Sequence, residues 1–195
     1  METGRILFHR CLANRQGVST IEFAFIAPLL MIILLGSVEL SLMTSMDRKV
    51  SAAAAALGDL ASRELEIDDC ELGDMFAATG LIFQPKSSAN ARFRLTSIRN
   101  EAGALQVVWS EARAPTDSDG TPLLGAMDDA ALTGSGLAPS LIPEGQSALY
   151  AESIWPHASL FSQFGLIEYD GLLKDTFLVR PRNASEVERD TLSTC

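Results

Sequence analysis

Two carboxylates, Glu22 and Glu39, flank the most apolar segment of this 195-residue chain. The residues between them, Phe23–Val38, read FAFIAPLLMIILLGSV and carry no charge. A charged side chain costs about 2.5–3.5 kcal/mol at the centre of a bilayer, so an ionisable residue in such a segment is expected to have a partner and a function. The alternative is a glutamate that reaches the headgroups at the membrane interface. We favour this interfacial interpretation for Glu39 and the functional one for Glu22.

Catalytic chemistry is poorly supported elsewhere in the chain. His157, Ser159 and Asp170 supply the three side chains of a hydrolase triad, but triads are recognised by geometry, and the sequence has no G-x-S-x-G motif. Asp117–Gly120 resembles half of a calcium-binding loop without its third acidic position, and we interpret it as a solvated turn. The histidines and cysteines show no metal-ligand spacing. We therefore expect no enzyme activity, no metal, no cofactor and no small-molecule substrate.

The apolar segment predicts a helix that spans a membrane. Counted to include both glutamates, it runs from about Val18 to Met43, longer than the ~20 residues that a spanning helix needs. Glu22 and Glu39 would lie about 26 Å apart along this helix, close to the hydrocarbon thickness. A cleaved signal peptide would have a shorter apolar core of ~7–15 residues and a small-x-small cleavage site. A membrane anchor fits the sequence better.

The net charge of the chain changes sign across this segment, from basic before it to acidic after it. Residues 1–17 carry three arginines against one glutamate, whereas residues 18–195 carry 12 Lys and Arg against 24 Asp and Glu. The basic N-terminus predicts that this end stays in the cytoplasm and that the acidic body lies outside the inner membrane, in the periplasm of a Gram-negative cell. An acidic body also argues against nucleic acid as a partner, because phosphates require neutralising Lys and Arg.

A short motif begins the apolar segment. Gly17 stands at the border between basic and apolar sequence, and after four residues it is followed by a glutamate and an aromatic residue. The stretch Arg15–Ala54 resembles the TadE-like family of minor pseudopilins from tight-adherence (Flp) pilus systems. The residues that fall where the family pattern places them are Gly17, Glu22, Phe23, Pro28 and Glu39.

The resemblance implies processing and assembly. A prepilin peptidase of the membrane would cut between Gly17 and Val18, and Glu22 would pair with the new α-amino group of Val18 on its own or a neighbouring subunit. Read without the resemblance, Gly17 marks only the N-terminal boundary of a helix. Pro28 removes one helical N–H and is expected to kink or loosen the helix at Ala24–Pro28.

The membrane helix is expected to continue into an amphipathic half. Apolar or small residues recur at helical spacing from Val50 to Leu65, which predicts one helix ending at Leu65. The expected divisions are a leader at 1–17, a transmembrane and extended helix at 18–66, and a periplasmic α+β head at 67–195. Together with the resemblance, this pattern predicts a pilin-like α+β fold, in which the long helix packs on a small antiparallel sheet with a second helix.

The head is predicted to contain three or four strands. Acidic residues at the start and a glycine at the end predict a helix at Asp68–Gly80, and Asn100–Gly103 has hairpin-turn chemistry. Ala114–Gly145 predicts an extended loop with at most short turns. The expected strands are Arg92–Ile98, Ala104–Trp109, Ser147–Trp155 ended by Pro156, and Thr176–Arg180 ended by Pro181.

Cysteine positions add a covalent prediction. Cys11 lies in the leader and would be removed by cleavage after Gly17, which leaves Cys70 and Cys195 in an oxidising compartment. A Cys70–Cys195 disulfide would close a long loop worth at most about 4–5 kcal/mol in the entropic model. Two free thiols or an intermolecular bond through Cys195 remain the alternatives.

The combined interpretation is a minor pseudopilin of a tight-adherence pilus system, inserted once in the bacterial inner membrane. Its expected partners are the membrane, other pilin-type subunits, proteins of the pilus assembly platform and the prepilin peptidase. One alternative is an unprocessed, single-pass, membrane-anchored periplasmic binding module. A second alternative is a membrane-anchored hydrolase.

Overall fold

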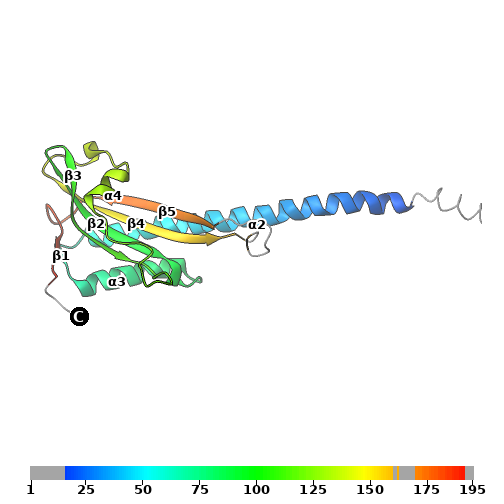
Figure 1. The fold of residues 1–195 in the computed structure, drawn as a ribbon, viewed down its shortest axis with the longest axis horizontal. Coiled ribbons are helices and arrows are strands. Elements are labelled where there is room, and N and C mark those ends of the chain that lie inside the picture. Colours follow the sequence, from blue (N-terminus) through cyan, green and yellow to red (C-terminus); the bar gives the residue numbers. More distant parts are fainter. Residues whose placement is uncertain (1–15, 160–161, 163–169, 192–195) are drawn as a thin grey trace, which may run out of the picture. The chain divides into compact units, whose positions relative to one another are not determined.

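The computed structural model describes residues 16–159, 162 and 170–191, and within these it has a long helix, an antiparallel sheet and shorter helices (Figure 1). Backbone contacts divide the chain into two units, Met1–Leu42 and Met43–Cys195. In the first unit, the described residues form the apolar half of helix α2. The second unit contains the rest of α2 and the sheet, and is called the head below. The predicted α+β fold with a long N-terminal helix is confirmed.

Helix α2 runs from Gln16 to Ala61 and continues through Pro28. Within the head it buries one face against the sheet, through Met46, Val50, Ala53, Leu57 and Ala61. These residues are three or four positions apart, as one face of an α-helix requires. The helix ends four residues before the predicted end at Leu65, because the backbone turns there and the Ser62 hydroxyl donates to the carbonyl oxygen of Asp59 at 2.9 Å.

Four strands form an antiparallel sheet in the order β3-β2-β4-β5. The two sequential strands β2 and β3 are joined by a tight turn in which Ala102 and Gly103 both have positive φ, 53° and 83°. Such a turn matches the twist of a two-residue hairpin, so the predicted hairpin is confirmed. The strands are β2 Arg92–Glu101, β3 Ala104–Arg113, β4 Ser147–Ala158 and β5 Asp170–Val179.

One face of the sheet carries the main core. Odd-numbered strand residues such as Leu95, Leu149 and Trp155 pack there with the buried face of α2 and with helix α3, Asp69–Gly80. Helix α2 approaches the sheet closely at Gly58, because a Cβ added there would lie 2.8 Å from the ring of Phe177. The predicted second helix is confirmed as α3. Its N-cap is Asp68, whose carboxylate accepts from the backbone N–H of Glu71 at 2.7 Å.

The opposite face is covered by the connection between β3 and β4. This connection contains the short helix α4, Asp129–Gly134, and contributes Met127, Leu132 and Ile142 to a second apolar cluster. The sequence predicted only turns in this region. A six-residue helix gives little periodic signal, and α4 buries a single side chain, Leu132.

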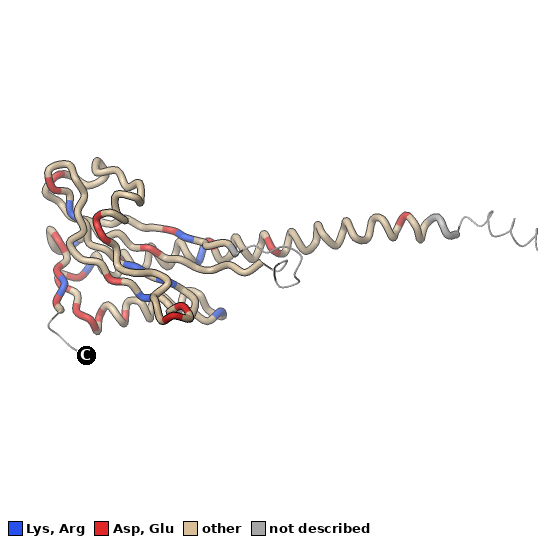
Figure 2. The backbone as a smooth tube through the Cα atoms, viewed as in Figure 1, with Lys and Arg blue, Asp and Glu red and all other residues tan. Residues whose placement is uncertain are grey.

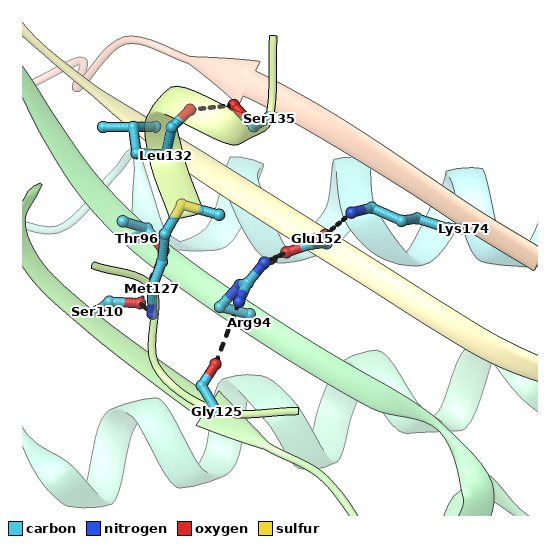
Figure 3. Close-up of polar contacts among 9 residues, drawn as sticks. All are labelled: Arg94, Thr96, Ser110, Gly125, Met127, Leu132, Ser135, Glu152 and Lys174. Atoms are coloured by element: carbon cyan, nitrogen blue, oxygen red, sulfur yellow. Dashed lines mark hydrogen bonds and ion pairs between the residues drawn. The ribbon is translucent and has the colours of Figure 1, made fainter. Parts of the chain in front are cut away.

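A buried ion cluster lies on the same face (Figure 3). Glu152 of β4 is fully buried and forms ion pairs with Arg94 of β2 and Lys174 of β5. The Nε atom of Arg94 donates to Glu152 at 2.7 Å, and its Nη1 atom donates to the carbonyl oxygen of Gly125 at 3.2 Å. The cluster therefore joins three strands and fixes the connecting loop to the sheet.

Two details of the strands differ from the prediction. Strand β4 passes through Pro156, which pairs with Leu172 of β5. Proline is tolerated there because the pairing of β4 with β2 ends at Ile154, so Pro156 has a strand on one side only. In addition, two-residue strands β1, Glu66–Ile67, and β6, Glu188–Arg189, form a parallel pair that the sequence did not predict.

Candidate functional site: the apolar half of helix α2

The apolar half of α2, Ser19–Leu42, exposes its large hydrophobic side chains. Their exposed fractions range from 41% at Val38 to 78% at Phe25. Helix α2 is long and apolar enough to span a membrane, and Figure 2 shows that its apolar half is almost without charge while charged residues are spread over the head. The exposed residues are Ile21, Phe23, Phe25, Ile26, Leu29, Leu30, Met31, Ile32, Ile33, Leu34, Val38, Leu40 and Leu42.

Glu22 is exposed within this apolar surface. On a helix, the side chains that can reach it lie three and four positions away. Toward the N-terminus these are Ser19 and Val18, and toward the C-terminus they are Phe25 and Ile26. None of the four is a cation, so a positive partner for Glu22 has to come from outside this stretch of α2.

Other predicted site residues lie on the same helix. Phe23 and Pro28 are exposed, and Glu39 is half-buried. The hydroxyl of Ser37 donates to the carbonyl oxygen of Leu34 at 2.8 Å, so this polar group is satisfied within the helix. The polar groups of the segment therefore differ, because Ser37 is satisfied internally whereas Glu22 has no cation within helical reach.

Gly17 and Val18 lie in the first turn of α2, which begins at Gln16. The first four N–H groups of a helix lack partners within it, so this turn is held by fewer internal hydrogen bonds than the middle of α2. A peptidase that binds an extended backbone would have to open this turn to reach the Gly17–Val18 bond. The prediction that the chain is cut there remains a prediction.

Comparison with known proteins identifies this segment. Residues 17–58 match the family of TadE-like proteins. The match confirms the predicted resemblance. It begins at Gly17 and ends at Gly58, where α2 lies close to Phe177 of the sheet. The sheet lies outside the TadE-like segment. No curated protein and no solved structure matches the chain.

The residues of the hypothetical hydrolase triad are differently placed. His157 and Ser159 are each only 5% exposed, and the side chain of Asp170 lies outside the described residues. Two hollows on the described part of the head, of about 420 and 350 Å³, are lined by other residues, among them Arg99 and Glu144 in one and Phe76 and Arg113 in the other.

Acidic groups of the head serve local structure. Asp68 and Glu71 form the capping box of α3, and Asp69 pairs with Arg189. At the turn that resembles half of a calcium loop, the Ser118 hydroxyl donates to Asp117 at 2.8 Å. This bond, together with backbone N–H donors, lowers the pKa of Asp117. Among the described residues, no group of three or more His, Cys, Asp or Glu side chains is placed to hold a metal ion.

Proposed function

We propose that this protein is a minor pseudopilin of a tight-adherence pilus system. The observation that carries the proposal is the TadE-like match on α2 at the segment that exposes its apolar residues and contains Glu22. TadE-like proteins are associated with pilus assembly, and pilin-type subunits work through packing of their N-terminal helices.

In this proposal, the exposed apolar surface of α2 is covered by lipid before assembly and by protein afterwards. Large apolar side chains in water cost roughly 25 cal/mol for each Å² of exposed area, so a surface of this extent is expected to be covered. Before assembly the bilayer covers it, with the N-terminus in the cytoplasm because of Arg5, Arg10 and Arg15. During assembly, helices of other pilin-type subunits replace the lipid.

Glu22 sets the register of that packing in the proposed mechanism. Cleavage between Gly17 and Val18 by the prepilin peptidase would create an α-amino group at the start of the helix. An ion pair between this group and Glu22 of a neighbouring subunit would satisfy a carboxylate that has no cation within helical reach. The axial offset between neighbouring subunits would then be fixed by one contact.

The test compares two substitutions in the apolar half of α2. Glu22→Ala removes the carboxylate, and Ser37→Ala removes a hydroxyl whose hydrogen bond is internal to the helix. In a deletion strain complemented with each variant, we expect Glu22→Ala to reach the membrane in normal amounts but to reduce surface pili at least tenfold. Ser37→Ala should retain normal piliation.

Two results would overturn the proposal. Normal pili from Glu22→Ala would remove the register role of this residue. Normal pili from the deletion strain itself would remove the pseudopilin function and would favour the single-pass binding module.

A further inference from the structure

A group of basic side chains lies where helix α2 enters the head. The helix becomes charged shortly after Met43, at Asp47, Arg48 and Lys49. Lys49 lies six residues after Met43, the last residue of the apolar stretch, and therefore about 9 Å further along the helix axis. A bilayer that covers α2 as far as Met43 would thus end at a distance from Lys49 comparable to the Debye length of about 8–10 Å.

Lys49 joins a second segment to this end of the head. Its Nζ atom donates to the carbonyl oxygen of Gln84 at 2.6 Å and to that of Phe83 at 3.3 Å. Both carbonyls lie at the end of the 3-10 helix η1, Leu81–Phe83, which directly follows α3. Lys86 follows Gln84 by two residues and is exposed. The loop that contains Lys86 is therefore fixed to α2 at the level of Lys49.

We call residues 47–49 and 81–86 the basic rim. It contains three cations, Arg48, Lys49 and Lys86, against one carboxylate, Asp47, so its net charge is +2. Within the described part of the chain, none of these three cations forms an ion pair, although the body of the protein is acidic overall. The cations that do form ion pairs in the described head are Arg63, Arg94, Arg99, Lys174, Arg182 and Arg189.

The basic rim also exposes apolar surface. The side chain of Leu81 is 62% exposed, and Pro85 is exposed as well. Segments that lie in a membrane interface combine such residues with lysines, because the apolar side chains enter the boundary of the acyl chains while the cations stay among the phosphates. An acidic protein would also satisfy the cations, but it would not explain why they stand directly beyond the membrane segment.

We propose that the basic rim binds anionic phospholipid headgroups at the surface of the membrane that α2 enters. The guanidinium of Arg48 and the ammonium of Lys86 donate charge-assisted hydrogen bonds to phosphate oxygens, while Lys49 holds the two segments of the rim together. The same membrane surface repels the acidic remainder of the head, so the contact orients the head. This inference goes beyond the proposed function, since it requires insertion of α2 but not pilus assembly.

The test places the full chain in lipid nanodiscs of two compositions, phosphatidylcholine alone and phosphatidylcholine mixed with phosphatidylglycerol. Hydrogen exchange is measured at the amides of Gln84 and Lys86, which donate to the carbonyl oxygens of Leu81 and Phe83 at 3.1 and 3.0 Å. These amides report opening of the rim. Since one cation near an anionic surface strengthens binding by about fivefold, we expect exchange with phosphatidylglycerol to be slower by at least this factor.

Two charge reversals provide the variant and its matched control. Lys86→Glu should lose most of the difference in exchange between the two lipids. Arg180→Glu should keep it, because this exposed arginine follows Val179, which lies beside Gly58 of α2, nine residues beyond Lys49. Sodium chloride at about 0.5 M should remove the difference in the wild type, since salt screens exposed charges. Exchange at the amides of β4 reports whether each variant is folded.

Three results would contradict the lipid contact. Equal exchange in the two nanodiscs would leave an acidic protein as the partner of these cations. Protection by phosphatidylglycerol that persists in Lys86→Glu would place the contact elsewhere. Protection that inorganic phosphate reproduces in phosphatidylcholine nanodiscs would show a site for a free anion. Because none of these measurements involves pili, failure here leaves the proposed function standing.

Discussion

At the residue scale, Glu152 is the centre of the buried ion cluster that joins strands β2, β4 and β5. Its carboxylate is fully buried, and its two partners differ, since the Arg94 side chain is 12% exposed and that of Lys174 is 50% exposed. Loss of one member of a buried ion pair leaves a buried charge without compensation. The cost of a substitution should therefore depend on which member is removed.

We predict that Glu152→Ala lowers the free energy of unfolding by about 3–5 kcal/mol, because the buried guanidinium of Arg94 loses its counter-ion. Lys174→Ala, the comparison variant, should cost less than Glu152→Ala, because the buried carboxylate of Glu152 keeps Arg94 as its counter-ion. Urea unfolding of the detergent-solubilised chain, followed by the fluorescence of the two head tryptophans, measures both. Equal losses from the two variants would show that the buried pair with Arg94 does not dominate.

Residues that form a local sequence motif could be predicted, whereas residues brought together by strand pairing could not. Gly17, Glu22 and Phe23 were predicted from their types and spacing, and all three lie on α2 within the TadE-like segment. Their roles stay predictions. The ion cluster around Glu152 was not found, because Arg94 and Glu152 are 58 positions apart and only the pairing of β2 with β4 brings them together. The partner that we propose for Glu22, the α-amino group of Val18 on a neighbouring subunit, would exist only after cleavage and assembly, so the structure of a single chain does not contain it.

At the scale of elements, the packing of α2 on the sheet depends on one glycine. A Cβ at Gly58 would lie 2.8 Å from Phe177 Cδ1 and 3.3 Å from Val179 Cγ1, whereas a Cβ at Gly73 of α3 would meet no atom within 4 Å. Both glycines are inside helices, where alanine is favoured by up to about 1 kcal/mol. The same substitution at the two sites therefore separates helix propensity from packing.

We predict that Gly73→Ala stabilises the head by up to about 1 kcal/mol. Gly58→Ala should be less favourable than Gly73→Ala by about 1–3 kcal/mol, because its methyl group forces Phe177 and α2 apart. Thermal unfolding of the two variants side by side gives this difference. If Gly58→Ala were as stabilising as Gly73→Ala, the result would contradict the close contact between α2 and Phe177 at this position.

Elements were predictable where their signals are local. The capping residues of α3 and the turn of the β2–β3 hairpin lie within a few positions of the elements they define, and both predictions were confirmed. The predicted strands were too short, because β3 extends to Arg113 and β5 begins at Asp170. The parallel pairing of β1 with β6 was missed because a two-residue pairing across 122 positions leaves no periodic pattern.

At the scale of the whole molecule, charge and hydropathy divide the sequence into three successive segments. The basic leader, the apolar half of α2 and the acidic body follow one another along the sequence. This order predicts a single orientation across a membrane, and the TadE-like match lies on the helix that would span it. The proposed pilus assembly and the proposed processing both depend on that orientation.

The mass of the chain recovered from membranes tests most directly whether this protein is a processed pseudopilin. We predict that the chain recovered from membranes begins at Val18, having lost residues 1–17, and that Gly17→Leu keeps the full-length mass because a bulky side chain blocks the peptidase at the scissile bond. A wild-type chain that retains Met1, or is cut at another bond, would contradict the pseudopilin assignment.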